Sequence, residues 1–229
     1  MTPTVRFDAD RARRIGLPEA VFCAGKTAEQ IAIAAEAGRT AHGRCLLTRL
    51  DTAMLAALPS GLRTALDHDP LSRTAVLGDW PAVRDEGSVA VVTGGTADLP
   101  VAGEVARTLR FAGCAATVFA DVGVAGLWRL LEIQERLAAF PVVILVAGME
   151  GALFTVAGGL LPGLLIAVPT AVGYGIATGG HTALNAALAS CAPGLLVTNI
   201  DNGYGAACAA LRALALPADA GRESPAPQT

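Results

Sequence analysis

Charge is missing from a long part of this 229-residue chain, because no aspartate, glutamate, lysine or arginine occurs between Glu150 and Asp201. A segment that excludes charge over such a length either crosses a membrane or encloses a dry site. A membrane-spanning helix needs about 20 continuous apolar residues, whereas glycine and proline interrupt this segment repeatedly. No cluster of lysine or arginine flanks it, as would be usual beside a membrane span. We therefore expect a dry enclosure and no membrane partner.

Basic residues are scarce as well. Lysine occurs once, at Lys26, and the formal net charge is −3, so the composition gives no reason to expect a nucleic-acid partner. The polar N-terminus, which contains Asp8 and Asp10, differs from a secretory signal peptide. The five cysteines form no CxxC pair. Reduced thiols in a cytoplasmic protein are the simplest account, and we expect most of these cysteines to fill small apolar spaces.

From about residue 88 onward, apolar strands alternate with helices. The predicted strands are 89–92, 115–119, 142–146, 164–168 and 195–198, and the predicted helices are 101–111, 127–137, 151–160, 182–190 and 206–213. Strands that are apolar throughout indicate a parallel sheet covered by helices on both faces. The pattern predicts an α/β domain over residues 86–215, a doubly wound parallel sheet of the flavodoxin-like kind.

The first 85 residues follow a different pattern. It predicts helices at 27–37 and 52–58 and strands at 44–48 and 74–77, which together form a small α+β domain over residues 1–85. The segment 216–229 is rich in proline and small polar residues. Such a composition predicts a disordered tail.

Glycine-rich polar clusters follow all five predicted strands of the second half. They occupy residues 93–98, 121–124, 148–150, 169–175 and 199–203. Ligands bind at the carboxyl ends of the strands in an open parallel sheet, so the clusters predict a ligand site at that edge. Tight turns also need glycine, and helix N-caps need threonine, aspartate or asparagine. That alternative explains any one cluster, but explains all five less well.

Three residues in these segments are candidates for chemistry. Asp98 ends a glycine loop suited to an anion, although a plain helix N-cap is an equal alternative. Glu150 follows a buried strand and must line a cleft or be buried at a high cost, which suits a base or a cation partner. Cys191 alone is most simply a buried structural cysteine. A helix C-terminus opposes its ionisation, so a thiolate would need positive charge from His181 or from a cationic substrate.

Read together, these segments resemble the LarB family, the pyridinium-3,5-biscarboxylic acid mononucleotide synthases of nickel-pincer cofactor biosynthesis. The matching segments are Ala147-Gly-Met-Glu-Gly-Ala152, Ala167-Val-Pro-Thr170, Val172-Gly-Tyr-Gly175, Ser190-Cys-Ala192 and Val197-Thr-Asn-Ile-Asp-Asn-Gly-Tyr-Gly-Ala206, with Arg11, Arg14-Ile-Gly16, Pro18-Glu19 and Gly25-Lys-Thr27 in the first half. The second half is also similar to the phosphoribosylaminoimidazole carboxylases.

The resemblance implies an enzyme that carboxylates the pyridinium ring of nicotinic acid adenine dinucleotide with carbon dioxide. The enzyme also hydrolyses the phosphoanhydride, giving the biscarboxylated mononucleotide and AMP. Cys191 would be the nucleophile and Glu150 the acid/base partner. The expected substrate-binding residues are Thr93, Gly94, Gly95, Thr96, Asp98, Gly148, Met149, Pro169, Thr170, Gly173, Tyr174, Gly175, Asn199, Asp201 and Asn202.

The resemblance further implies carbon dioxide as a co-substrate, no tightly bound organic cofactor and no resident protein metal site, with a magnesium requirement left open. It implies a homo-oligomer, for which the related carboxylases suggest an octamer.

Two other functions stay open at this point. A purine-pathway aminoimidazole ribotide carboxylase or mutase would share the Gly-Thr-Ala-Asp stretch, but it carries a Ser-Ala-His-Arg type motif where this chain has Asp121-Val-Gly-Val-Ala-Gly126. A non-catalytic nucleotide-binding module would use the same crevice without chemistry.

Overall fold

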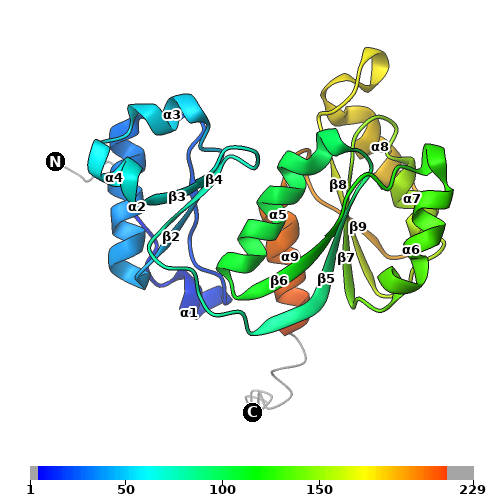
Figure 1. Cartoon of the computed structure of the whole chain (residues 1–229), viewed down its shortest axis with the longest axis horizontal. Coiled ribbons are helices and arrows are strands. Elements are labelled where there is room, and N and C mark those ends of the chain that lie inside the picture. The colour runs from blue at the N-terminus through cyan, green and yellow to red at the C-terminus, as the bar shows by residue number, and fades with distance from the viewer. Residues whose placement is uncertain (1–4, 216–229) are drawn as a thin grey trace, which may run out of the picture.

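A five-stranded sheet forms where the second half of the sequence is richest in apolar residues. The computed structural model describes residues 5–215, and Figure 1 shows its two sheets. The strands of the larger sheet are β5 (Asp85–Thr93), β6 (Cys114–Phe119), β7 (Val142–Ala147), β8 (Leu164–Pro169) and β9 (Leu195–Val197). Their order is β6-β5-β7-β8-β9, and every adjacent pair is parallel. This order is that of a flavodoxin-like doubly wound sheet, so the predicted fold class is confirmed.

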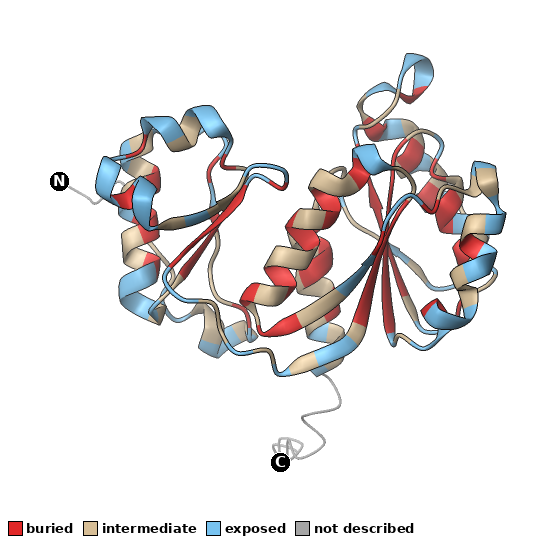
Figure 2. Ribbon diagram, in the orientation of Figure 1, coloured by how far each residue is buried: buried red, intermediate tan, exposed pale blue. Residues whose placement is uncertain are grey.

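Helices cover both faces of this sheet (Figure 1). Helices α5 (Leu99–Phe111) and α9 (Gly203–Ala215) pack on one face, and α6 (Trp128–Ala138), α7 (Ala152–Gly158) and α8 (His181–Leu188) pack on the other. Short 3-10 turns occur at η1 (Thr96–Asp98), η2 (Val124–Gly126) and η3 (Gly175–Gly180). The middle of the sheet is buried from both sides (Figure 2). This double burial is the reason that the strands are apolar throughout.

The first half of the chain forms a second, four-stranded sheet. Its strands are β1 (Val21–Phe22), β2 (Cys45–Thr48), β3 (Leu66–Asp69) and β4 (Thr74–Leu77), in the order β1-β2-β4-β3. The helices of this half are α1 (Arg11–Ile15), α2 (Ala28–His42), α3 (Thr52–Ala57) and α4 (Ser60–Ala65). Helix α2 starts with a capping box between Thr27 and Gln30, which satisfies backbone N–H groups of its first turn. The sequence patterns did not predict α1, β1, α4 or β3.

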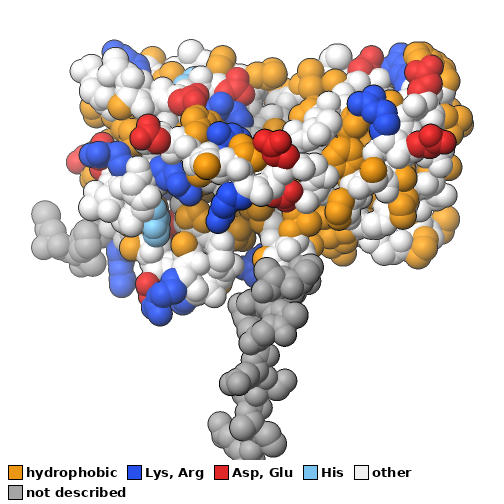
Figure 3. Space-filling model, turned by 60° about the horizontal axis from the view of Figure 1, so that its bottom comes forward, with side chains coloured by type: hydrophobic (Ala, Val, Ile, Leu, Met, Phe, Trp, Pro, Cys, Tyr) orange, Lys and Arg blue, Asp and Glu red, His pale blue; other side chains and the backbone are white. Residues whose placement is uncertain are grey.

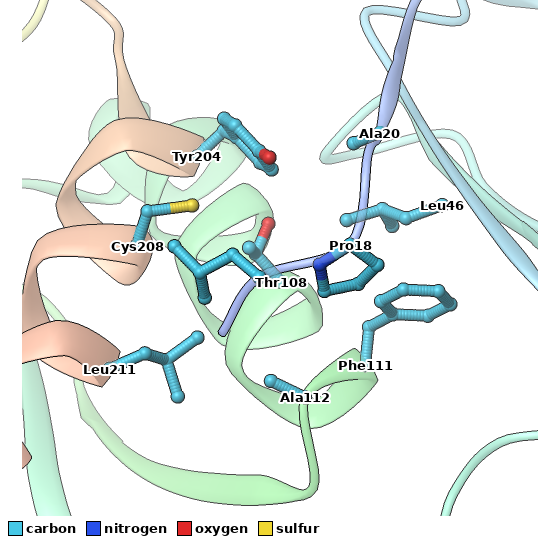
Figure 4. Close-up of a pocket in the computed structure, with 10 residues that line it drawn as sticks. Pro18, Ala20, Leu46, Thr108, Phe111, Ala112, Tyr204, Cys208 and Leu211 are labelled. Carbon is cyan, nitrogen blue, oxygen red and sulfur yellow. The ribbon is translucent and has the colours of Figure 1, made fainter. Parts of the chain in front are cut away.

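Helices α5 and α9 lie between the two sheets, so each of them contacts both halves of the chain (Figure 1). On the side of the small sheet, Leu46 and Val76 pack against Phe111 of α5. Figure 4 shows an apolar crevice at the same boundary, where Pro18 and Leu46 face Phe111 and Tyr204. Apolar contacts of this kind hold the two halves together.

The surface of the molecule carries both signs of charge. On the face drawn in Figure 3, lysine and arginine side chains alternate with acidic ones and do not gather into one basic patch. Across the part of the chain that the structure describes, no helix is long and apolar enough to cross a membrane. The segment 216–229, for which disorder is predicted, lies outside the described residues.

Candidate active site

A pocket of about 320 Å³ opens at the carboxyl edge of the large sheet. Pockets of this size and larger hold small ligands in other proteins. Six of the predicted site residues line it, and they come from the loops after β5 and β7: Gly94, Gly95, Asp98, Gly148, Met149 and Glu150. Asp98 and Glu150 are the ionisable residues among its lining residues, and the other lining residues are glycine or apolar. The pocket is therefore an open, mostly apolar depression with two carboxyl groups, of which Asp98 is buried and Glu150 is exposed.

Asp98 is held at the pocket by one neighbour from its own loop and one from the loop after β8. Its carboxyl group accepts a hydrogen bond from the Thr170 hydroxyl at 2.7 Å and one from the Gly95 backbone N–H at 2.9 Å. Burial raises the pKa of Asp98, while the Thr170 and Gly95 donors lower it. Its side chain makes no capping hydrogen bond to α5. Asp98 is therefore not a plain N-cap of α5, and its bond to Gly95 instead closes the short turn η1.

Glu150 lies on a strained turn between β7 and α7. Met149 before it has φ 54° and Gly151 after it has φ 65°, both in the left-handed region. Gly148 has no room for a side chain, because a Cβ there would come within 2.1 Å of the Val172 carbonyl oxygen. The Met149 N–H donates to that same oxygen. From this turn Glu150 lines the pocket and is exposed to solvent, in keeping with the cleft-lining carboxylate that the sequence predicted.

The remaining predicted substrate residues do not line this pocket. Thr93 is buried and accepts the Asp121 N–H, so it joins two loops at the sheet edge, whereas Thr96 is exposed. Residues 171–180 form a loop that rises above the sheet edge, shown in yellow in Figure 1. The other residues that the sequence assigned to substrate belong to the end of β8, to this loop and to the segment after β9: Pro169, Thr170, Gly173, Tyr174, Gly175, Asn199, Asp201 and Asn202. Tyr174 of this loop is 77% exposed.

Cys191 does not lie among the residues that line the Glu150 pocket. It follows the end of α8, and its neighbour Ser190 bonds to the Thr155 hydroxyl at 2.8 Å. Ala192 packs on Gly158, the last residue of α7. Cys191 therefore lies toward the end of α7 that is remote from Glu150. Within one chain the structure does not bring the two residues together.

The environment of Cys191 also differs from the default expectation for a cysteine. Cys23, Cys45 and Cys114 are buried, as expected for apolar filling, but Cys191 is exposed. Burial raises the pKa of Cys23 and of Cys45 to about 12. The structural interpretation of Cys191 is therefore wrong, since its thiol is open to solvent. His181 lies at the opposite end of α8, a helix roughly 12 Å long, so it is not a partner for this thiol within one chain.

Other features of the molecule fit a substrate less well. The apolar crevice of Figure 4 has a volume of about 20 Å³, which is room for little more than a water molecule. Among residues 5–215, no three His, Cys, Asp or Glu side chains gather as metal ligands.

Some site residues had no usable signal in the sequence. Gly123, Val124 and Ala125 line the pocket from the loop after β6. The glycine cluster at 121–124 pointed to this loop, but small apolar side chains gave no reason to select them. Val172 lines the pocket as well. Its carbonyl oxygen makes the contact with the Gly148 turn. Every residue type has a backbone carbonyl group, so the sequence gives no sign of this contact.

Comparison with known proteins decides the family. The family model described as the LarB/PurE-like N-terminal domain matches residues 2–79. The uncharacterized protein MJ0165 of Methanocaldococcus jannaschii is 35% identical over 211 residues, which cover 88% of this chain and 80% of that protein. The chain belongs to the LarB family. The resemblance in its motifs is thereby confirmed, and the chain is a member of a PurE-related carboxylase family.

One solved structure is similar to part of this LarB-family chain. A variant of PurE2 from Treponema denticola matches with 19% identity and a TM-score of 0.47, covering 58% of this chain and 82% of that chain. The flavodoxin-like assignment rests on the strand order of the large sheet.

Proposed function

We propose that this LarB-family chain carboxylates the pyridinium ring of nicotinic acid adenine dinucleotide and hydrolyses its phosphoanhydride. The observation that carries the proposal is the pocket at the carboxyl edge, whose walls are apolar apart from Glu150 and Asp98. A cationic aromatic ring is attracted by carboxylates in a water-poor site. Apolar walls also limit attack of water on reactive intermediates. AMP and pyridinium-3,5-biscarboxylic acid mononucleotide would be the products.

The proposed chemistry balances without an oxidant. The exposed Cys191 thiol gives its proton to solvent, and the thiolate adds to the ring carbon para to nitrogen, which breaks aromaticity and leaves an enamine. The free meta carbon of the enamine then attacks carbon dioxide and forms a carbon–carbon bond. Glu150 takes the proton from that carbon, and expulsion of the thiolate restores the aromatic ring. Sulfur suits this role because it both adds and leaves readily.

Hydrolysis of the phosphoanhydride is a separate step. Water attacks one phosphorus atom, the bridging P–O bond breaks, and each half of the dinucleotide keeps one phosphate. Gly94 and Gly95 lie in the pocket wall, where the lack of side chains leaves room for a phosphate, although their N–H groups already donate to Val146 and Asp98.

The position of Cys191 gives the proposal a further requirement. Cys191 is exposed and lies outside the pocket of its own chain. A covalent mechanism at Glu150 therefore needs the thiol of a second copy, in keeping with the homo-oligomer that the family resemblance implies. In the proposal, the pocket of one chain receives Cys191 from another chain. The positive charge that favours the thiolate would come from the substrate ring itself.

The test is incubation of the purified protein with nicotinic acid adenine dinucleotide and isotope-labelled bicarbonate. We expect a product that gains one labelled carboxyl group, together with an equal amount of AMP, measured by mass spectrometry. The same incubation with an aminoimidazole ribotide tests the purine alternative. Carboxylation of the ribotide with none of the pyridinium ring would replace the proposal, and binding without turnover of either compound would favour a non-catalytic module.

A further inference from the structure

An arginine from the small N-terminal sheet reaches into the other half of the molecule. Arg49 follows β2 in a left-handed turn with φ 56°. Its Nε lies 3.3 Å from Oε1 of Glu104 on α5, and the two side chains are 23% and 4% exposed. A carboxylate as buried as Glu104 needs a partner of opposite charge, since an unpaired buried charge is strongly unfavourable. Arg49 is that partner within residues 5–215.

Glu104 also accepts a hydrogen bond from the start of α9, the helix that follows the loop after β9. The Tyr204 N–H donates to Oε2 of Glu104 at 3.2 Å. Gly203 approaches so closely that a Cβ there would come within 2.9 Å of Glu104 Oε2 and 2.7 Å of the Val101 carbonyl oxygen. The negative carboxylate therefore lies between the guanidinium group and a helix N-terminus, two groups that both favour it. Burial raises the pKa of Glu104, and Arg49 opposes that effect.

Another nitrogen atom of the Arg49 guanidinium group contacts the loop after β9 directly. Its Nη2 donates to the backbone carbonyl oxygen of Asp201. Asp201 has φ 56°, an uncommon conformation for a residue other than glycine. Its N–H donates to the Pro169 carbonyl oxygen at 2.7 Å, and its Oδ1 accepts the Ala171 N–H at 2.9 Å. Asp201 therefore ties the loop after β9 to the loop after β8.

From Ala171 the connections continue into the pocket. Thr170, the preceding residue, donates its hydroxyl to Asp98 Oδ1 at 2.7 Å. The other oxygen of Asp98 accepts the Gly95 N–H, and Asp98 and Gly95 both line the pocket. An unbroken series of hydrogen bonds and covalent links thus runs from Arg49 in the N-terminal half to the pocket wall.

A simpler account is that Arg49 only holds the two halves of the chain together. Arg107 of α5, which also bridges the halves, provides a comparison, with Nη2 3.1 Å from Asp67 Oδ1 and Nε donating to Thr74 at 2.7 Å. Its guanidinium group lies 4.9 Å from the centre of the Trp80 ring. None of these contacts involves a pocket loop. Arg107 and the apolar side chains around the crevice of Figure 4 already join the halves. Arg49, in contrast, contacts the loop after β9.

We propose that Arg49 is a positioning residue for the active site, contributed by the N-terminal domain. By pairing with Glu104 and holding the Asp201 carbonyl oxygen, it fixes the loops after β8 and β9 and, through Thr170, the carboxyl group of Asp98. The inference rests on the proposed function for its activity readout alone. The loop geometry can be measured without any substrate.

The first experiment compares hydrogen exchange in Arg49→Met, Arg107→Met and the unchanged protein. We expect Arg49→Met to speed amide exchange about fivefold to tenfold in residues 169–172 and 199–206, because their tethers are weakened. Arg107→Met should leave those segments unchanged. Equal exchange in the two variants would overturn the positioning role, whatever the protein does to nicotinic acid adenine dinucleotide.

A second variant decides the matter if Arg49→Met does not fold. Arg49→Lys keeps the charge beside Glu104, but a single ammonium group cannot reproduce the planar fork that serves Glu104 and Asp201 together. We expect a folded protein with faster exchange at 199–206 and, if turnover is present, a lower kcat at little changed KM. Unchanged exchange and unchanged kcat in Arg49→Lys would overturn the proposal. If the unchanged protein shows no turnover of nicotinic acid adenine dinucleotide, that result counts against the proposed function only.

Discussion

The hydroxyl group of Thr170 donates to Oδ1 of Asp98 at 2.7 Å, and this bond joins the loops that follow β8 and β5. Both side chains are buried. Two loops that are 72 residues apart in the chain are thereby held against one pocket. The site depends on this bond, because a buried carboxyl group without a donor is unfavourable.

Removal of the Thr170 hydroxyl is expected to destabilise the protein. We predict that Thr170→Val lowers the free energy of unfolding by about 1–3 kcal/mol near neutral pH, since Asp98 loses a donor while staying buried. Thr96→Val is the matched control, because Thr96 is exposed at the same edge. Equal denaturation midpoints for the two variants would show that the bond contributes nothing.

The pH dependence of stability follows from the direction of the Asp98 pKa shift. Burial raises the pKa of Asp98 above its ordinary value of 3.8, so the folded state binds the proton more tightly than the unfolded chain. The stabilising contribution of the protonated form is fully present below that ordinary value, and it is lost as the pH rises through the raised pKa. We predict that Asp98→Ala removes this part of the pH dependence, measured by urea unfolding at a series of pH values. An unchanged slope would contradict the assignment.

The close approach of the turn at Gly148 to Val172 predicts a second loss. Gly148→Ala would place a Cβ within 2.1 Å of the Val172 carbonyl oxygen, and overpacking of this kind typically costs about 1–3 kcal/mol. Gly61→Ala is the control, since nothing lies within 4 Å of a Cβ there. Thermal melting should separate the variants, with Gly148→Ala the less stable. A melting temperature for Gly148→Ala at or above that of Gly61→Ala would refute the close contact.

Glu150 is predicted to move a proton in the reaction. Glu150→Gln keeps the shape of the side chain but cannot act as a base, so we expect kcat to fall by about 10²–10⁴-fold. Glu135→Gln changes an exposed carboxylate on α6, outside the pocket, and should leave kcat unaltered. Steady-state AMP release gives the comparison. Similar rates for the two variants would rule out Glu150 as the base.

Much of the fold could be predicted from the sequence, since the large sheet is buried on both faces and its strands are therefore continuous apolar runs. Strand β3 was missed because its sequence, Leu66-Asp-His-Asp69, is charged and lies at the edge of the small sheet. Strand β1 has two residues, too few to show any period. Helix α4 follows Pro59 directly and was too short for a helical period to be recognised.

The site was predictable in part, for a related reason. Glycine clusters mark the strand ends locally, so Gly94, Asp98 and Glu150 could be named. Arg49 could not, because its contact with Asp201 spans 152 residues and nothing near Arg49 in the sequence reports it. The exposure of Cys191 was also hidden, since an apolar sequence context indicates burial while the structure places the thiol in a surface loop.

The most direct test of the account asks whether Glu150 and Cys191 act together from two copies of the chain. Co-expression of Glu150→Gln chains and Cys191→Ala chains, with different tags, would give mixed oligomers from two inactive parents. If each pocket takes its glutamate from one chain and its cysteine from another, random mixing should restore about a quarter of the unchanged protein's carboxylation rate. Mixed oligomers as inactive as their parents would contradict the shared site.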